Sequence, residues 1–153
     1  MPNWKVIGTI VLGTLVGFML NPHAPLGAAL FGAPPAGDHE PTGGQVGALM
    51  AVALVEAIAF GLGLAFLVFG YAAMARRLGS DGSTRLAHLA VVWGLMSWVP
   101  HTAMHQTNGD NIARLIVIEY AFHVTLVLAA AALAWAFVRS SGRRAGDLDA
   151  ATA

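Results

Sequence analysis

Four long apolar stretches constrain the fold of this chain more than any other feature of its sequence. They cover approximately residues 4–20, 46–75, 85–106 and 112–138, and each carries very few charged side chains. A helix rises about 1.5 Å per residue, so roughly 20 apolar residues can cross a bilayer core about 30 Å thick. The sequence therefore predicts an all-α integral membrane protein that folds as a bundle of four transmembrane helices.

The composition agrees with a membrane location and excludes several classes of function. Of the 153 residues, 57% are hydrophobic and 10% are charged, and the mean hydropathy is +0.68. The formal net charge is zero, whereas nucleic-acid binding needs concentrated Lys and Arg. The chain has no cysteine, so disulfides and thiolate ligands are excluded. Any metal must be held by His, carboxylate, Met or backbone oxygen.

The segments between and after the apolar stretches are polar or rich in glycine and proline. Residues 21–45 contain five prolines and are expected to form an outer loop, with a short turn over residues 26–31. Pro100 is expected to kink the third stretch, because it lacks the N–H that would bond the carbonyl of Met96. Residues 139–153 are small and polar and are predicted to form a disordered cytoplasmic tail, which leaves a single domain over residues 1–138.

The first stretch, residues 4–20, has two interpretations. One positive charge followed by an apolar run is also the pattern of a cleaved signal peptide. However, Thr9, Gly13 and Gly17 lie on one helix face, and small residues of this kind allow membrane helices to pack closely. We therefore expect a retained transmembrane helix.

The basic residues predict an orientation in the membrane. Seven of the eight lie at the start of the first stretch, between the second stretch and the start of the third, or after the fourth, namely Lys5, Arg76, Arg77, Arg85, Arg139, Arg143 and Arg144. With four spans, all seven fall on one side of the bilayer, and cytoplasmic ends of membrane helices carry the excess of Lys and Arg. This predicts a protein of the bacterial inner membrane with both termini in the cytoplasm.

Ionisable residues inside the apolar stretches are the best clue to function. They are Glu56 in the second stretch, His101 and His105 in the third, and Glu119 and His123 in the fourth. Helix geometry places all five within about 15 Å of the outer ends of the spans. The two residues of each i, i+4 pair share one helix face. Because a charged side chain in lipid costs on the order of 2.5–3.5 kcal/mol, we expect the five to face one cavity, with His105 at its outer mouth.

Three histidines and two carboxylates form a ligand set suited to a transition metal such as Fe, Cu or Zn. We expect His101 and His123 to bind the cofactor, His105 to serve as a further metal ligand, and Glu56 and Glu119 to be metal ligands with a catalytic role. The spacing Glu-x3-His differs from the Glu-x2-His of di-iron bundles, and the His101–His105 segment lacks the glutamate of the zinc-protease motif. The prediction is a metal-dependent membrane oxidoreductase, favoured over a hydrolase, that acts on a small or lipidic molecule.

Three alternatives are open at this stage. A b-type haem held by His123 and a histidine of the third stretch would fit a helical bundle. A zinc-dependent hydrolase would use a metal-bound water with Glu56 or Glu119 as the base. A non-catalytic accessory or proton-relay subunit of a larger membrane complex would use the same polar residues for interhelical hydrogen bonds. The expected partners are the lipid bilayer and either other membrane subunits or further copies of the chain, and no nucleic acid.

Overall fold

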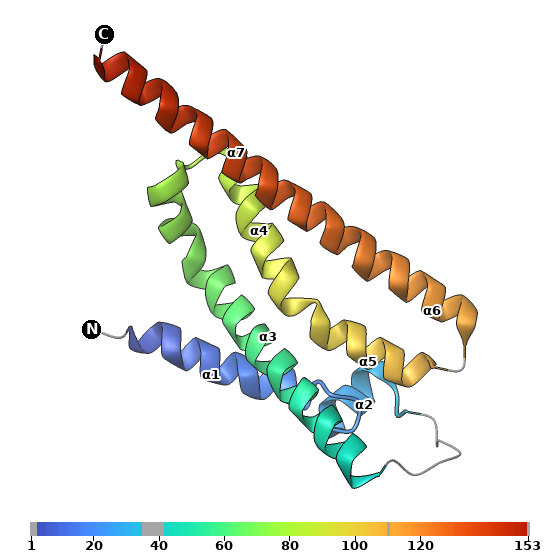
Figure 1. Ribbon diagram of the computed structural model, residues 1–153. Helices are drawn as coiled ribbons and strands as arrows, with labels where there is room; N and C mark the ends of the chain where they lie inside the picture. Colours follow the sequence, from blue (N-terminus) through green and yellow to red (C-terminus); the bar gives the residue numbers. More distant parts are fainter. Residues whose placement is uncertain (1–2, 35–41, 110, 153) are drawn as a thin grey trace.

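The computed structural model describes residues 3–34, 42–109 and 111–152, and these residues form helices joined by short connections (Figure 1). In chain order the elements are α1 (Trp4–Met19), α2 (Pro25–Phe31), α3 (Gly43–Leu78), α4 (Gly82–Met96), α5 (Trp98–Asn108), α6 (Ile112–Glu119), the π-helical turn η1 (Tyr120–Val124) and α7 (Thr125–Thr152). No strand occurs among the described residues, so the all-α class is confirmed. Residues 35–41 of the expected outer loop lie outside the described residues.

Side chains at the helix ends explain several of these boundaries. Thr42 and Gln45 form a capping box at the start of α3, in which each side chain accepts a hydrogen bond from the other residue's backbone N–H. Asp81 and Asn111 accept backbone N–H donors at the starts of α4 and α6. Gly79 ends α3 with a φ of 88°, a conformation that suits glycine.

The long helices form an open layer in which each packs on the next one. α1 packs on α3, α3 packs on α4, and α4 packs on α7, whereas α7 makes no comparable interface with α1 or α3 among the described residues. Figure 1 shows the same order, with α1 and α7 at the two edges. A closed four-helix bundle would need contact between the first and last helices. The observed arrangement is therefore less closed than the predicted bundle.

Glycines allow α1 and α3 to approach closely. A Cβ atom added to Gly13 would lie 2.8 Å from the Cα of Gly61, and one added to Gly17 would lie 3.1 Å from the Cα of Ala57. Gly13 and Gly17 belong to the small-residue face predicted for the first stretch, and this face does contact α3.

The third apolar stretch is divided at Ser97, which separates α4 from α5. The N–H of Ser97 still donates to the carbonyl of Trp93 at 3.0 Å, and the N–H of His101 donates to Ser97 at 3.1 Å. The helix is interrupted at Ser97, about one turn before Pro100. Pro100 has no N–H to bond the carbonyl of Met96, which is the residue just before the interruption. The expected kink is therefore present, and it turns α5 relative to α4.

Two of the helical segments are long and apolar enough to cross a membrane. They are Gly43–Leu78, which is α3, and Ile112–Arg139, which comprises α6, η1 and the first part of α7. α1 is a shorter apolar helix. Beyond the last predicted span, α7 continues to Thr152 through residues that were expected to form a disordered tail.

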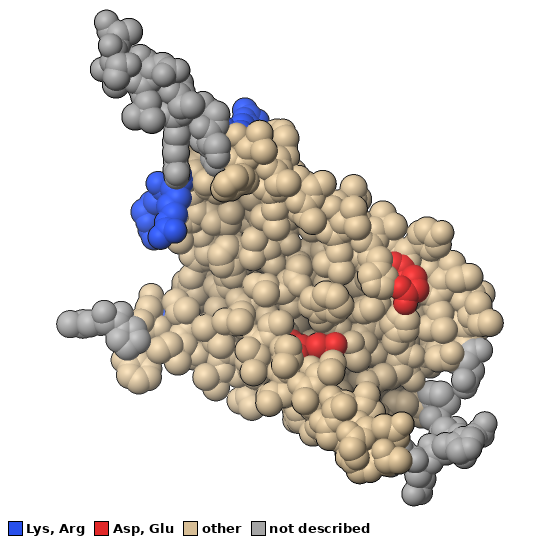
Figure 2. Space-filling view, viewed as in Figure 1, with Lys and Arg blue, Asp and Glu red and all other residues tan. Residues whose placement is uncertain are grey.

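Charged atoms are sparse on the face seen in Figure 2. Lys and Arg gather at the end where α3 meets α4, and the uncharged face is interrupted by small acidic areas. Both termini lie toward this basic end, whereas α2 and the connection from α5 to α6 lie at the opposite end (Figure 1). The polar residues predicted to form the site come from the helices nearer that second end.

Candidate metal centre

Three of the predicted site residues come together from consecutive elements at the α5–α6 end of the layer. His101 lies on α5, Glu119 is the last residue of α6, and His123 lies in η1. Each offers one ligand atom, and these three atoms all lie within 4.8 Å of one another. We call His101, Glu119 and His123 the His/Glu triad.

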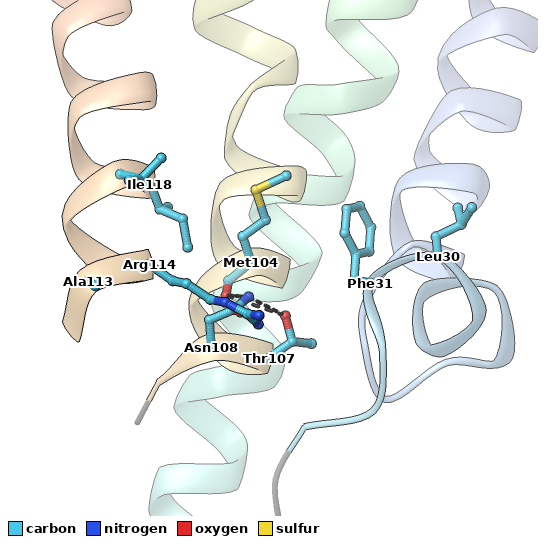
Figure 3. Close-up of a pocket in the computed structure, with 9 residues that line it drawn as sticks. Leu30, Phe31, Met104, Thr107, Asn108, Ala113, Arg114 and Ile118 are labelled. Carbon is cyan, nitrogen blue, oxygen red and sulfur yellow. Dashed lines mark hydrogen bonds between the residues drawn. The ribbon is translucent and has the colours of Figure 1, made fainter. Parts of the chain in front are cut away.

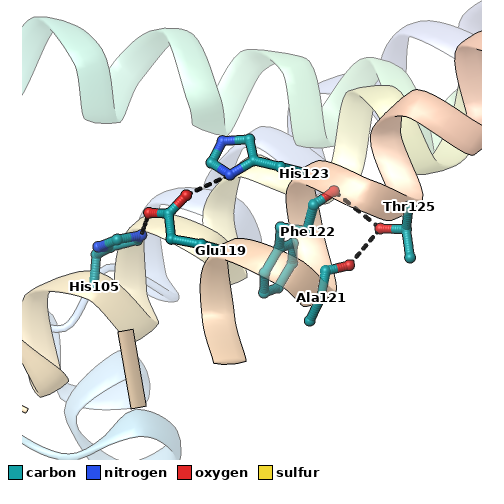
Figure 4. Close-up of polar contacts among 6 residues, drawn as sticks. All are labelled: His105, Glu119, Ala121, Phe122, His123 and Thr125. Carbon is teal, nitrogen blue, oxygen red and sulfur yellow. Dashed lines mark hydrogen bonds and ion pairs between the residues drawn. The ribbon is translucent and has the colours of Figure 1, made fainter. Parts of the chain in front are cut away.

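Glu119 connects the triad to His105, because its two carboxylate oxygens contact different histidines (Figure 4). One oxygen lies 2.8 Å from Nε2 of His105, and the other contacts Nδ1 of His123. The side chains of Glu119 and His123 are 44% and 52% exposed, and that of His105 is 32% exposed. His105, which was expected at the mouth of the site, thus contacts the triad through Glu119, and the cluster opens to one side.

His101 occupies the inner side of the cluster. Its ring centroid lies 4.6 Å from that of His105, 5.2 Å from that of His123 and 5.1 Å from that of Phe122. Nε2 of His101 is buried and has no hydrogen-bond partner within the part of the chain that the structure describes. A buried imidazole nitrogen without a partner costs free energy, and a metal ion is one group that could satisfy it.

The π-helical turn η1 determines how His123 is presented. Thr125 Oγ1 donates toward the carbonyls of Ala121 at 2.5 Å and Phe122 at 3.0 Å, and it accepts from Trp93 Nε1 at 3.0 Å. The ring of Trp93 also stacks on Phe122, with 5.8 Å between centroids and 8° between planes. These contacts fix η1 against α4, which places His123 beside the end of α6.

Neither this turn nor the residues that support it were predicted from the sequence. Single π-helical turns inside longer helices are frequent at functional sites. The sequence signal that could have indicated this support was Thr125, a polar residue that begins the last part of the run, after His123 and Val124. A periodicity analysis that assumes an unbroken α-helix over residues 112–138 cannot detect such an insertion.

The spacing of the triad suits a metal ion after a small adjustment. A tetrahedral ion with ligand bonds of about 2.1 Å holds its ligand atoms about 3.4 Å apart. The ligand atoms of the triad lie within 4.8 Å of one another, so the largest separation exceeds this value by at most about 1.4 Å, a distance on the scale of a side-chain rotation. Two imidazoles and one carboxylate also leave coordination positions for a further ligand.

The rings of His101 and His123 are also close to the spacing of two axial haem ligands. Two axial histidines on one haem iron place their ring centroids about 6 Å apart on opposite faces of the porphyrin. The centroids are 5.2 Å apart here, and Glu119 lies beside both rings. Glu119 is a further ligand that a single ion could use and that a haem with two axial histidines would not.

Glu56, which was predicted to share this centre, lies in a different environment. Its Oε1 accepts a hydrogen bond from Thr102 Oγ1 at 2.6 Å. It lines a cavity of about 10 Å³ together with residues of α1, α3 and α5, including Gly17 and Ala53. Thr102 follows His101 on α5, so its side chain points about 100° away around the helix. The structure therefore brings together four of the five predicted residues and pairs Glu56 with Thr102.

Comparisons of the chain with protein-family models, with curated proteins and with solved structures found no match.

Proposed function

We propose that this chain is an integral membrane protein with four spans, formed by α1, by α3, by α4 with α5, and by α6 with α7. In the most apolar 18-residue window of α3, only 22% of the residues are buried, and in that of the segment Ile112–Arg139 only 11% are buried. A core helix of a soluble protein would bury most such residues. Leu54, Val68 and Val127, which are 49%, 58% and 68% exposed, are examples of side chains that lipid would cover.

The proposed location is the bacterial inner membrane, with both termini in the cytoplasm. The support is the position of the basic residues, because Arg76, Arg77 and Arg85 flank the same end of the layer as the termini. Reporter fusions after Arg139 and within the α5–α6 connection test this orientation. A periplasmic signal from the first fusion, or a cytoplasmic signal from the second, would contradict it.

The central proposal is that the His/Glu triad binds one divalent transition metal such as Fe, Cu or Zn. The observation that carries it is the convergence of His101, Glu119 and His123 from three elements, with their ligand atoms within 4.8 Å. His105 contacts Glu119, so it can orient the carboxylate or become a further ligand. Once bound, the ion would supply Lewis acidity or redox chemistry at the open side of the cluster.

For the reaction, we propose an oxidoreductase that acts on a small or lipidic molecule, in preference to a hydrolase. Two histidines and one carboxylate with open positions are the ligands of many non-haem iron oxygenases and also of some zinc hydrolases. A hydrolase needs a general base near the metal-bound water. Glu119 is a ligand in this scheme and Glu56 is paired with Thr102, so the hydrolase lacks the bases that the sequence offered.

The proposed partners are lipid and a further membrane subunit, which could be another copy of this chain. The open layer leaves one side of Glu119 and His123 uncovered, and polar groups at this depth are costly in contact with lipid tails. A packed subunit or a bound substrate would cover them. An accessory or proton-relay role would use the same contacts without metal.

The test of the metal centre compares two glutamates that both lie on apolar helices. Elemental analysis of the purified full-length protein should find about one equivalent of Fe, Cu or Zn. Glu119→Gln should reduce this content at least tenfold, because the amide is a poor ligand. The matched control Glu56→Gln should leave it unchanged. Equal metal content in the wild type and in Glu119→Gln would refute the centre.

A further inference from the structure

A groove separate from the His/Glu triad opens between α2, α5 and α6. Its volume is about 630 Å³, and Figure 3 shows Leu30 and Phe31 on one side, Ile118 on the other, and Met104 between them. Val117 also lines it. The walls are therefore mainly apolar and come from three different helices.

One end of this groove carries a positive charge that is held in place. Arg114 lines the groove, and its Nη1 donates a hydrogen bond to Oδ1 of Asn108 at 3.1 Å. Asn108 is itself fixed, because its Nδ2 donates to the carbonyl of Met104 at 2.9 Å and to Thr107 Oγ1 at 3.1 Å. Figure 3 shows the guanidinium lying beside Asn108 and Thr107 at the mouth of the groove. A guanidinium has five N–H donors, so a bond to Asn108 leaves others for an anion.

With the membrane location proposed above, the charge and the apolar walls of the groove lie at different depths in the bilayer. Arg114 is two residues from the start of α6, so it lies about 3 Å from the outer end of that helix. Val117 and Ile118 lie about 8 Å from the same end and thus deeper. The groove therefore presents a cation at the level of lipid headgroups and apolar surface at the level of the first acyl carbons.

We propose that this groove binds an anionic phospholipid of the outer leaflet, with its phosphate on Arg114 and one acyl chain between α2 and α6. Arginine forms charge-assisted hydrogen bonds with phosphate, and its fixed fork matches the phosphate oxygens. A zwitterionic lipid would bring a second cation toward the guanidinium and bind more weakly. The proposal rests on the membrane location proposed above, but it does not depend on the metal centre.

The test uses the purified full-length protein in a mild detergent and native mass spectrometry to count bound lipid. Phosphatidylglycerol should bind about tenfold more tightly than phosphatidylcholine of the same acyl chains, and Arg114→Gln should abolish this preference. Arg139→Gln removes an arginine that lies over Trp135 at the other end of the layer, and it should keep the preference. Val117→Trp places a larger side chain in the groove and should weaken the binding of both lipids.

The possible outcomes decide the proposal in either direction. A preference for phosphatidylglycerol that survives in Arg114→Gln, or that Arg139→Gln reduces equally, would overturn it. Competition by millimolar inorganic phosphate would indicate a site for a free anion and would also overturn it. Circular dichroism checks that each variant stays helical.

Metal content should be unchanged in all of the variants, so failure of the lipid site is distinguishable from failure of the metal centre. Membrane extraction of the wild type tests the membrane location separately.

Discussion

Replacing His123 by alanine should lower the metal affinity of the protein by about two to three orders of magnitude. Structural zinc sites with four ligands bind with about 10–16 kcal/mol of free energy, which corresponds to roughly 2.5–4 kcal/mol per ligand. Each 1.4 kcal/mol is a tenfold change in affinity, so the loss of one ligand corresponds to a few hundredfold. His123 also contacts Glu119. After the substitution, the Glu119 carboxylate keeps only its contact with His105.

The assay is a competition titration of the purified protein against a chromophoric zinc chelator in detergent. The matched control is His23→Ala, because His23 is an exposed histidine between α1 and α2 that is not among the residues whose ligand atoms converge. His23→Ala should bind metal like the wild type. An affinity of His123→Ala within threefold of the wild type, with unchanged helical content, would show that the triad does not bind the metal.

The remaining predictions concern the surroundings of the triad and the packing of the layer. His105→Ala should weaken metal binding only about 10- to 100-fold in the same titration, because His105 reaches the triad through Glu119. Thr125→Val should lower metal affinity about tenfold and alter the near-ultraviolet circular dichroism of Trp93, since it removes the hydroxyl that joins η1 to α4; unchanged values for both would contradict a positioning role. Gly61→Ala should destabilise the protein by about 1–3 kcal/mol in thermal unfolding, because the added Cβ would lie 2.7 Å from the backbone nitrogen of Thr14. Gly8→Ala, with open space around the added carbon, should be neutral or slightly stabilising.

The helical elements could be predicted from the sequence because apolar runs of this length have few alternative structures. The break near Pro100 follows from the missing N–H of that residue, and the close contact of α1 with α3 follows from the spacing of Gly13 and Gly17. The short helix α2 was expected only as a turn over residues 26–31. These features depend on local chemistry or on one helix face, which periodicity reveals.

The order of the helices in space could not be predicted in the same way. α3 carries small residues on more than one side, since Gly61 lies against α1 and Gly63 lies against Met96 of α4. In a membrane, lipid would also be as apolar as the side chains that face it. Hydrophobic patterning therefore does not distinguish a closed bundle from the observed open layer. The π-helical turn could not be predicted either, because it depends on the contact of Thr125 with Trp93, a residue that lies on another helix.

For Glu56, the sequence predicted the depth of the side chain in the helix but not the direction in which it points. Counting residues placed both Glu56 and His123 within about 15 Å of the outer ends of their spans, and an unsatisfied carboxylate in an apolar helix does need a partner. Its partner is Thr102, which neighbours His101 in sequence but projects from a different side of α5. Depth could be calculated from the chain, whereas direction depended on how α3 and α5 are rotated against each other.

The triad joins α5 to α6 and η1, and α5 and α6 pack over a small interface. α5 and α6 pack over a smaller interface than α4 and α7 do, and the connection between them passes through residue 110, outside the described residues. His101 lies on α5, and Glu119 and His123 lie on the other side of that connection. An ion bound to all three would therefore join two segments that otherwise contact each other little. Binding energy at such a site also stabilises the folded arrangement. Metal binding should therefore shorten the separations of up to 4.8 Å between the ligand atoms and pack α5 more tightly against α6.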